Sequence, residues 1–326
     1  MTLSRQGAGR RHRFENPPGS PPAGGSRLDW AAFSWRRFRD GRTQGEGLPS
    51  SLVLPRAEVL RGLDALLPRD GILWLGHSCF LIRLGGRTLL TDPFLSDHAS
   101  PSYRLGPRRH TPPALRAHEL PPVDIVLLSH AHYDHLDRPA LAALVGREQA
   151  TIVTGLGMRR YLDDLGYGRV IELGWHEAAA LDGLQVAAVP AIHFNRRTLA
   201  DRNLALWCGF RAETRGRCVY FAGDTAYGPV FKETGALYAG PDLALVPIGA
   251  YDPIPLMQAV HCTPEQAVAI GRDLAATALC AMHWGAIRLT DEPILEPPAR
   301  FRTAAIAAGY AQDRALALRV GETHTL

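Results

Sequence analysis

The feature that most constrains this chain is a cluster of polar residues that directly follows a short apolar run. Residues 125–128 read Ile-Val-Leu-Leu, which is typical of a strand buried on both faces. Three histidines and one aspartate follow within six residues: His130, His132, Asp134 and His135. So many polar groups cannot lie in a dry interior unless each has a partner. A bound metal ion would supply that partner.

The residues after the cluster predict a helix. Asp137 can cap it, Pro139 fits its first turn, and residues 140–145 form its body. The cluster therefore lies in a strand-to-helix loop, at the sheet edge where such folds hold ligands. Alternate residues leaving a strand point the same way, so His130 and His132 can share one ion while Asp134 and His135 point toward a second.

Three more candidate ligands follow predicted strands further along the chain. His193 comes after Val189–Ile192, Asp224 after Tyr220–Gly223, and His283 after Leu279–Met282. Any one of them alone would more often pack or cap than bind a metal. Together with the upstream cluster they indicate a site for two metal ions.

The H-x-H-x-D-H loop resembles the signature of the metallo-β-lactamase-fold hydrolases, and the three later residues match that family's further ligands in order. The resemblance implies the following division of ligands: His130, His132 and His193 on one ion, Asp134, His135 and His283 on the other, and Asp224 bridging. A nitrogen-rich set with carboxylates and no thiolate suits two Zn²⁺ ions best, with Mn²⁺ or Fe as alternatives. Asp134, Asp224 and His261 are the expected catalytic residues, and His77 and Asp92 should support the metal loops through hydrogen bonds.

The same resemblance gives the fold. Strands alternate with helices throughout, but hairpins such as the one around Gly85-Gly86 are mixed in, so the sheets should be mixed. The family implies an α/β chain built as a four-layer αββα sandwich, with two mixed sheets and helices on the outer faces. We expect an arm over residues 1–50 and the hydrolase domain over 51–326. Further expected elements include a helix over about 157–165 and a strand over 204–211.

A narrower resemblance rests on motifs between residues 71 and 300. The segments Trp74–Ser78, Leu90–Phe94, Pro247–Tyr251 and His283–Gly285 are similar to those of the N-acylphosphatidylethanolamine-hydrolysing phospholipases D. That family implies attack of a metal-bridging hydroxide on a phospholipid phosphodiester, which yields an N-acylethanolamine and phosphatidic acid. Arg196, Arg197 and Tyr251 are the candidate substrate contacts, although the two arginines fit an ordinary solvated face equally well.

Two alternative functions stay open. One is a lactonase or sugar-phosphate hydrolase on the same fold, although an aromatic, basic arm favours a lipid substrate. The other is a non-catalytic metal-binding module. All seven expected ligands are present, and a protein that had lost its activity would be expected to lack at least one.

Composition bears mainly on location and partners. Residues 1–50 hold nine arginines and four acidic residues, whereas the remaining chain is nearly neutral. Residues 28–39 could form an amphipathic helix opened by Asp29, which would either contact an anionic membrane or pack on the core. No apolar run approaches the ~20 residues of a membrane span, and the five cysteines form no C-x-x-C pair. We expect a cytoplasmic protein, peripheral at the inner membrane surface at most, with no nucleic-acid partner. The sequence does not determine the oligomeric state.

Overall fold

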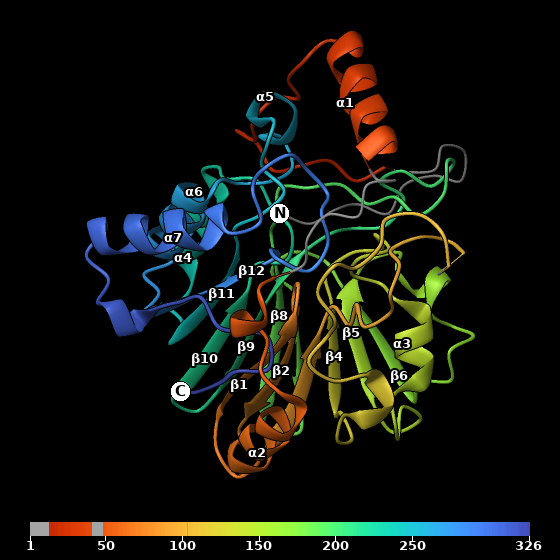
Figure 1. Cartoon of the computed structure of the whole chain (residues 1–326). Helices are drawn as coiled ribbons and strands as arrows, with labels where there is room; N and C mark the ends of the chain where they lie inside the picture. Colours follow the sequence, from red (N-terminus) through yellow and green to blue (C-terminus); the bar gives the residue numbers. More distant parts are fainter. Residues whose placement is uncertain (1–12, 41–47, 103) are drawn as a thin grey trace.

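The computed structural model describes residues 13–40, 48–102 and 104–326, which form two seven-stranded sheets packed face to face (Figure 1). The first sheet has the order β14-β1-β2-β3-β4-β5-β6. Its strands are β1 (Gly71–Gly76), β2 (Cys79–Leu84), β3 (Arg87–Thr91), β4 (Ile125–Leu128), β5 (Thr151–Gly155), β6 (Arg169–Leu173) and β14 (Thr323–Thr325). The second sheet has the order β13-β12-β11-β10-β9-β8-β7. Its strands are β7 (Ala178–Leu181), β8 (Leu184–Val189), β9 (Gly209–Thr214), β10 (Arg217–Phe221), β11 (Leu243–Pro247), β12 (Ala278–Met282) and β13 (Ala315–Leu316).

The two sheets repeat the same pattern of strand directions. In the first, β14, β1, β2 and β3 pair antiparallel, and β3 to β6 pair parallel. In the second, β7 to β10 pair antiparallel and β10 to β13 pair parallel. Strands β3 and β10 therefore hold equivalent places, and Asp92 and Asp224 follow them closely. The weak similarity between the two halves of the sequence thus corresponds to a repeat in the fold.

Helices cover the outer faces of both sheets and complete the predicted four layers. In Figure 1, α3 (Arg138–Ala143) lies outside the first sheet, and α4 (Val230–Leu237), α6 (Pro264–Asp273) and α7 (Glu296–Ala307) lie outside the second. Helix α2 (Arg56–Leu66) packs near β1 and β14. The remaining helices are α1 (Arg27–Asp40), α5 (Ile254–Met257) and the short 3₁₀ turns η1 (Ser50–Leu52), η2 (Ala117–Glu119), η3 (Arg159–Tyr161) and η4 (Gln312–Arg314).

Strand β4 is buried on both faces, as its apolar run predicts. Ile125 and Leu127 belong to the core between the sheets, whereas Val126 and Leu128 belong to the core under the outer helices. The cap of α3 is confirmed as well, because the Asp137 side chain accepts a hydrogen bond from the amide of Ala140. Both ends of the loop that carries the polar cluster are therefore fixed.

Several predicted elements differ from the structure. The helix expected over 157–165 is wrong, because only the 3₁₀ turn η3 forms there. The strand expected over 204–211 begins at Gly209, since residues 204–208 form a buried loop. Helices α2 and α4 and strands β7 and β14 were not predicted. Helix α4 and strands β7 and β14 are too short to show a clear period. Helix α2 has Val59, Leu63 and Leu66 at helical spacing, a signal that the prediction missed.

The described part of the arm contacts the hydrolase domain. Within residues 13–26, the Phe14 amide donates to the carbonyl of Asn203 at 2.8 Å, and the Asn16 side chain accepts from the His193 amide at 2.9 Å. The helix predicted over 28–39 is present as α1, but Ser26 rather than Asp29 caps it, because Ser26 Oγ accepts from the Asp29 amide. No described helix is both long and apolar enough to cross a lipid bilayer.

Candidate metal centre

All seven residues predicted as metal ligands lie together at one edge of the two sheets. Each follows the end of a strand: β4 contributes the H-x-H-x-D-H loop, and β8, β10 and β12 contribute His193, Asp224 and His283. Six of the seven are buried and His132 is half-buried. The position of each residue after a strand therefore identified side chains that meet in the fold although they are up to 153 positions apart in the sequence.

Three histidines form the first group of facing ring nitrogens. Nδ1 of His132 lies 2.8 Å from Nε2 of His130 and 3.2 Å from Nε2 of His193. Burial lowers the pKa of His132 to about 3 and that of His193 to about 4. The imidazoles are therefore neutral at ordinary pH and can direct lone pairs toward a shared cation.

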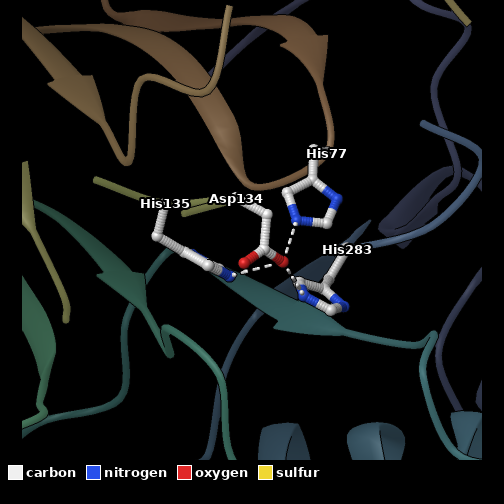
Figure 2. Close-up of side chains that lie close together, drawn as sticks. All are labelled: His77, Asp134, His135 and His283. Atoms are coloured by element: carbon white, nitrogen blue, oxygen red, sulfur yellow. Dashed lines mark hydrogen bonds and ion pairs between the residues drawn. The ribbon is translucent and has the colours of Figure 1, made fainter. Parts of the chain in front are cut away.

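The second group contains one histidine more than was predicted. Figure 2 shows His77, His135 and His283 arranged around Asp134, each with Nε2 directed toward the same carboxylate oxygen. The distances from that Oδ2 atom are 3.1 Å to His77, 3.5 Å to His135 and 3.6 Å to His283. His77 lies in the turn between β1 and β2, with a positive φ of 58°. The structure thus places a residue expected to support the loop at the edge of the group itself.

Asp224 lies between the two groups. Its Oδ2 atom is 3.2 Å from Nε2 of His135 and 3.1 Å from Nε2 of His283, both in the second group. The same oxygen lies 3.8 Å from Nε2 of His193, in the first group. This position suits a carboxylate that contacts two ions.

The donor set fits a metal. The ligand atoms within each group lie within 4.8 Å of one another. Among the described residues, Nε2 of His135, Oδ1 of Asp224 and both ring nitrogens of His283 are buried without a hydrogen-bond partner. Neutral imidazole nitrogens and ionised carboxylates are ligands that divalent transition metals accept. A cation bound between them would give these buried polar atoms a partner.

The histidines and carboxylates of the second group shift one another's pKa values. Burial alone would lower the pKa of His283, but the carboxylates of Asp224 and Asp134 raise that pKa to about 9. Burial would likewise raise the pKa of Asp224, yet His135 and His283 hold it well below its usual range. The carboxylates are therefore ionised, and a metal would have to displace protons from the histidines to bind.

His261 lies beside both groups, and its ligand atom lies within 4.8 Å of those of His193 and Asp224. Its ring centroid is 5.1 Å from that of His193 and 5.4 Å from that of His283. Its Nδ1 atom is buried without a hydrogen-bond partner among the described residues. Burial lowers its pKa well below the usual value, so the ring is neutral.

The predicted substrate contacts already have partners within the protein. Arg197 donates from one NH group to the carbonyls of Ala131 at 3.0 Å and Leu136 at 2.9 Å, so it fastens the loop that carries the cluster. Arg196 donates to the carbonyl of Thr198, and the Tyr251 hydroxyl donates to Glu296 at 2.9 Å. Their contact with substrate stays a prediction.

Two further supporting contacts have no local signal in the sequence. Asn16, in the arm, accepts from the His193 amide, and Asn195 accepts from the Ala131 amide at 3.2 Å. Both contacts join segments far apart in the sequence. Only the folded chain reveals them.

A cavity of about 400 Å³ opens beside the second group. His77 and His283 lie at its metal side, and the loop that follows β12 forms much of the remaining wall. Apolar side chains there include Trp284, Ile287 and Leu289. A cavity of this size and character, next to perturbed ionisable groups, is the usual form of a substrate site.

Comparison with known proteins gives one family and several relatives. Residues 87–284 match the family described as "Beta-lactamase superfamily domain". An uncharacterized protein of Mycobacterium tuberculosis is 40% identical over 259 residues, which cover 78% of this chain and 68% of that protein. The N-acyl-phosphatidylethanolamine-hydrolyzing phospholipase D 1 of Caenorhabditis elegans is 35% identical over 236 residues, which cover 69% of this chain and 66% of that protein. A solved metallo hydrolase from the archaeon Ignicoccus hospitalis is 25% identical, with a TM-score of 0.59 over 79% of this chain and 98% of its own.

Proposed function

Because the chain belongs to the beta-lactamase superfamily and is a metal-dependent hydrolase of that fold, we propose that it cleaves a phospholipid phosphodiester. The proposed substrate is an N-acylphosphatidylethanolamine and the products are an N-acylethanolamine and phosphatidic acid. The observation that carries the proposal is the position of Asp224, whose Oδ2 atom lies within 3.8 Å of ring nitrogens from both groups. The sequence similarity to the worm phospholipase D supports the choice of substrate.

Two zinc ions are the proposed cofactors, with manganese or iron as alternatives. We assign the first ion to His130, His132 and His193, the second to Asp134, His135 and His283, and Asp224 to both. When bound, the ions would supply an activated water at neutral pH and stabilise the charge that develops on the phosphate oxygens.

The side chains of the site position the reacting groups. Asp134 accepts a hydrogen bond from the attacking water and so orients its oxygen toward phosphorus. His261 contacts a phosphate oxygen through its ring. A bond forms between phosphorus and the water oxygen, the bond to the ethanolamide oxygen breaks, and the water proton goes to that leaving oxygen.

Helix α1 is the proposed contact with an anionic membrane surface. It stands away from the two sheets beside α5 (Figure 1) and packs through Phe33 against Leu256 and Met257. Two of its large apolar side chains face solvent: Leu28 is 80% exposed and Trp35 is 64% exposed. Four arginines in the α1 sequence outnumber its two aspartates. Aromatic residues combined with basic ones are typical of helices that lie at a lipid surface.

The test is turnover in mixed micelles by protein loaded with zinc. Three substrates are compared: an N-acylphosphatidylethanolamine, a soluble bis-aryl phosphodiester and a lactone, with the products identified by mass. We expect release of N-acylethanolamine, and we expect Asp224→Asn and His132→Ala to abolish it while each variant stays folded by circular dichroism.

Other outcomes would redirect the proposal. Cleavage of the diester or the lactone without cleavage of the lipid would contradict the lipid substrate but leave a hydrolase. Full activity in the Asp224→Asn variant would remove this residue from the site. Binding of less than one zinc ion per chain, measured by elemental analysis, would contradict the two-metal assignment.

A further inference from the structure

The cavity beside the second group has a polar end and an apolar body. His77 and His283 line the end next to the candidate metal ligands. Apolar atoms form most of the remaining wall, with Ile287, Leu289 and Ile294 among the contributors. The polar residues of the wall are Arg288, Thr290, Asp291 and Glu292. The cavity therefore runs from the reacting centre into an apolar environment.

The acidic groups in the wall are already bonded to other parts of the protein. The carboxylate of Glu292 accepts from the amides of Ala250 at 2.6 Å and Asp252 at 3.2 Å. The carboxylate of Asp291 pairs with Arg36 of α1 at 3.2 Å. These carboxylates are thus engaged in holding the wall in place, so a charged or sugar-like ligand would gain little from them.

The contact between Arg36 and Asp291 also links the cavity to α1. The loop between β12 and α7 carries one wall of the cavity and touches the helix that we assign to the lipid surface. The cavity therefore borders the candidate metal centre through His77 and His283, and its wall contacts the helix that would face a membrane through Asp291.

We propose that this cavity binds the N-acyl chain of the substrate and sets the preference for its length. This inference rests on the proposed function. The amide of an N-acylethanolamide lies only two methylenes from the scissile oxygen, so the amide would stay at the polar end of the cavity. The aliphatic chain would then extend along the apolar wall. Trp284, which lines the cavity, has an Nε1–H group without a hydrogen-bond partner among the described residues.

The glycerol-linked chains are a less suitable occupant for the same cavity. Both are anchored in the bilayer, and each methylene withdrawn from lipid must be buried again in protein. A volume of about 400 Å³ lies near the lower end of the range for small-ligand sites. It suits one chain attached close to the reacting phosphate rather than a diacylglycerol.

The experiment compares two substrates that differ only in the N-acyl group, N-palmitoyl- and N-butyryl-phosphatidylethanolamine. Wild-type protein should prefer the palmitoyl substrate by at least ~10-fold in kcat/KM, because it alone fills the apolar wall. Leu289→Trp, which fills the cavity, should reduce that ratio by ~10-fold or more, and Leu289→Ala, which removes contact, by ~3-fold. Leu295→Trp is the matched control, since Leu295 is 44% exposed and does not line the cavity.

A substrate without glycerol-linked chains identifies which chain is bound. Glycerophospho-N-palmitoylethanolamine should show the same sensitivity to Leu289→Trp. If that sensitivity disappears with this substrate, or if the palmitoyl-to-butyryl ratio is the same in wild type and both Leu289 variants, the inference is overturned.

A binding measurement distinguishes failure of this inference from failure of the proposed function. Zinc-loaded wild-type protein should bind N-palmitoylethanolamine in equilibrium dialysis, and Leu289→Trp should weaken binding by ~10-fold or more. Such binding in a protein that fails to hydrolyse the lipid would support the cavity and contradict the proposed function. Hydrolysis of the lipid with no dependence on Leu289 in rate or binding would support the function and overturn the cavity assignment.

Discussion

Nδ1 of His135 lies 2.7 Å from Oδ2 of Asp92, and this hydrogen bond fixes which ring nitrogen faces the metal centre. Because the carboxylate accepts, Nδ1 carries a proton, and Nε2 is the nitrogen that faces Asp134 and Asp224 and would bind a metal there. The same Oδ2 atom accepts from the hydroxyl of Ser129, whose oxygen lies 2.8 Å from Nδ1 of His130. One buried carboxylate therefore orients a histidine in each group.

Asp92→Asn should consequently weaken metal binding at both ions while the protein stays folded. An amide can still accept from the Ser129 backbone N–H, but it places an NH₂ group or a weaker acceptor opposite Nδ1 of His135 and the Ser129 hydroxyl. Loss of such a supporting contact typically costs 10–100-fold in metal affinity. We expect a decrease of about that size for zinc, measured by competition with a chromophoric chelator.

The exposed Asp182, whose side chain is 77% accessible, provides the control. Asp182→Asn should bind zinc as wild type does. If Asp92→Asn also retains wild-type affinity for both ions, the hydrogen bond has no role in setting the geometry of the site.

Arg197→Ala tests whether this arginine fastens the loop that carries the cluster or holds the substrate phosphate. If the side chain chiefly fastens the loop through the carbonyls of Ala131 and Leu136, the variant should lose stability by ~1–3 kcal/mol and bind zinc more weakly. KM for the lipid would then change little once zinc is saturating. Urea unfolding of the metal-free and the zinc-loaded protein measures the loss directly.

Arg196→Ala is the matched comparison. Among the described residues, the Arg196 side chain donates to the carbonyl of Thr198, two positions away, and so does not fasten the loop that carries the cluster. The stability of this variant should stay within ~0.5 kcal/mol of wild type. A large rise in KM for Arg197→Ala, without a change in stability, would instead show that Arg197 holds the substrate phosphate.

Much of the fold and the metal centre could be predicted from the sequence because their signals are local. The apolar run of β4, the Asp137 cap and the polar cluster lie within 13 consecutive residues, from 125 to 137. His193, Asp224 and His283 were found because each follows an apolar strand, and strand ends gather at one sheet edge. Patterns of neighbouring residues were sufficient to select these candidates, whose role as metal ligands stays a prediction.

The contacts that support the centre could not be found in this way. Asn16 reaches His193 across 177 positions, and the Arg197 side chain bonds to carbonyls more than 60 positions away. Arginine and asparagine in polar segments have no periodicity that distinguishes a buried partner from a solvated side chain. His77 looked like a supporting residue, and only its distance to Asp134 places it within the second group.

Replacement of two exposed α1 residues tests the membrane contact. Leu28→Ser together with Trp35→Ser should weaken binding to vesicles containing anionic phospholipid by ~10-fold or more, because both side chains are mostly exposed and removed from water only at the lipid surface. Sedimentation with sucrose-loaded vesicles measures the change. Hydrolysis of the soluble diester should be unaffected, since neither residue lies at the metal centre.

The control replaces an equally exposed leucine on another helix. Leu237, at the end of α4, is 65% exposed, and Leu237→Ser should bind vesicles as wild type does. Equal binding by wild type and the double α1 variant would show that α1 packs on the protein without contacting lipid.

Asp201 makes stability depend on pH in a predictable direction. Burial alone would raise its pKa, but the amides of Thr198 and Arg197 and the Tyr161 hydroxyl donate to it and hold the pKa below its usual value. In the unfolded chain the pKa returns to about 3.9. The carboxylate therefore stabilises the fold above that pH, and this contribution is lost as the pH falls through the lower folded-state pKa.

Asp201→Asn should accordingly be less stable than wild type by ~1–3 kcal/mol between pH 5 and 8, because the charged acceptor is lost. The difference should shrink below about pH 4, where wild-type Asp201 begins to protonate in the unfolded state. Urea unfolding of both proteins across this range measures it, with the exposed Asp313→Asn, whose side chain is 79% accessible, as control. A difference that stays constant down to pH 2 would mean that the amide donors do not depend on the charge of Asp201.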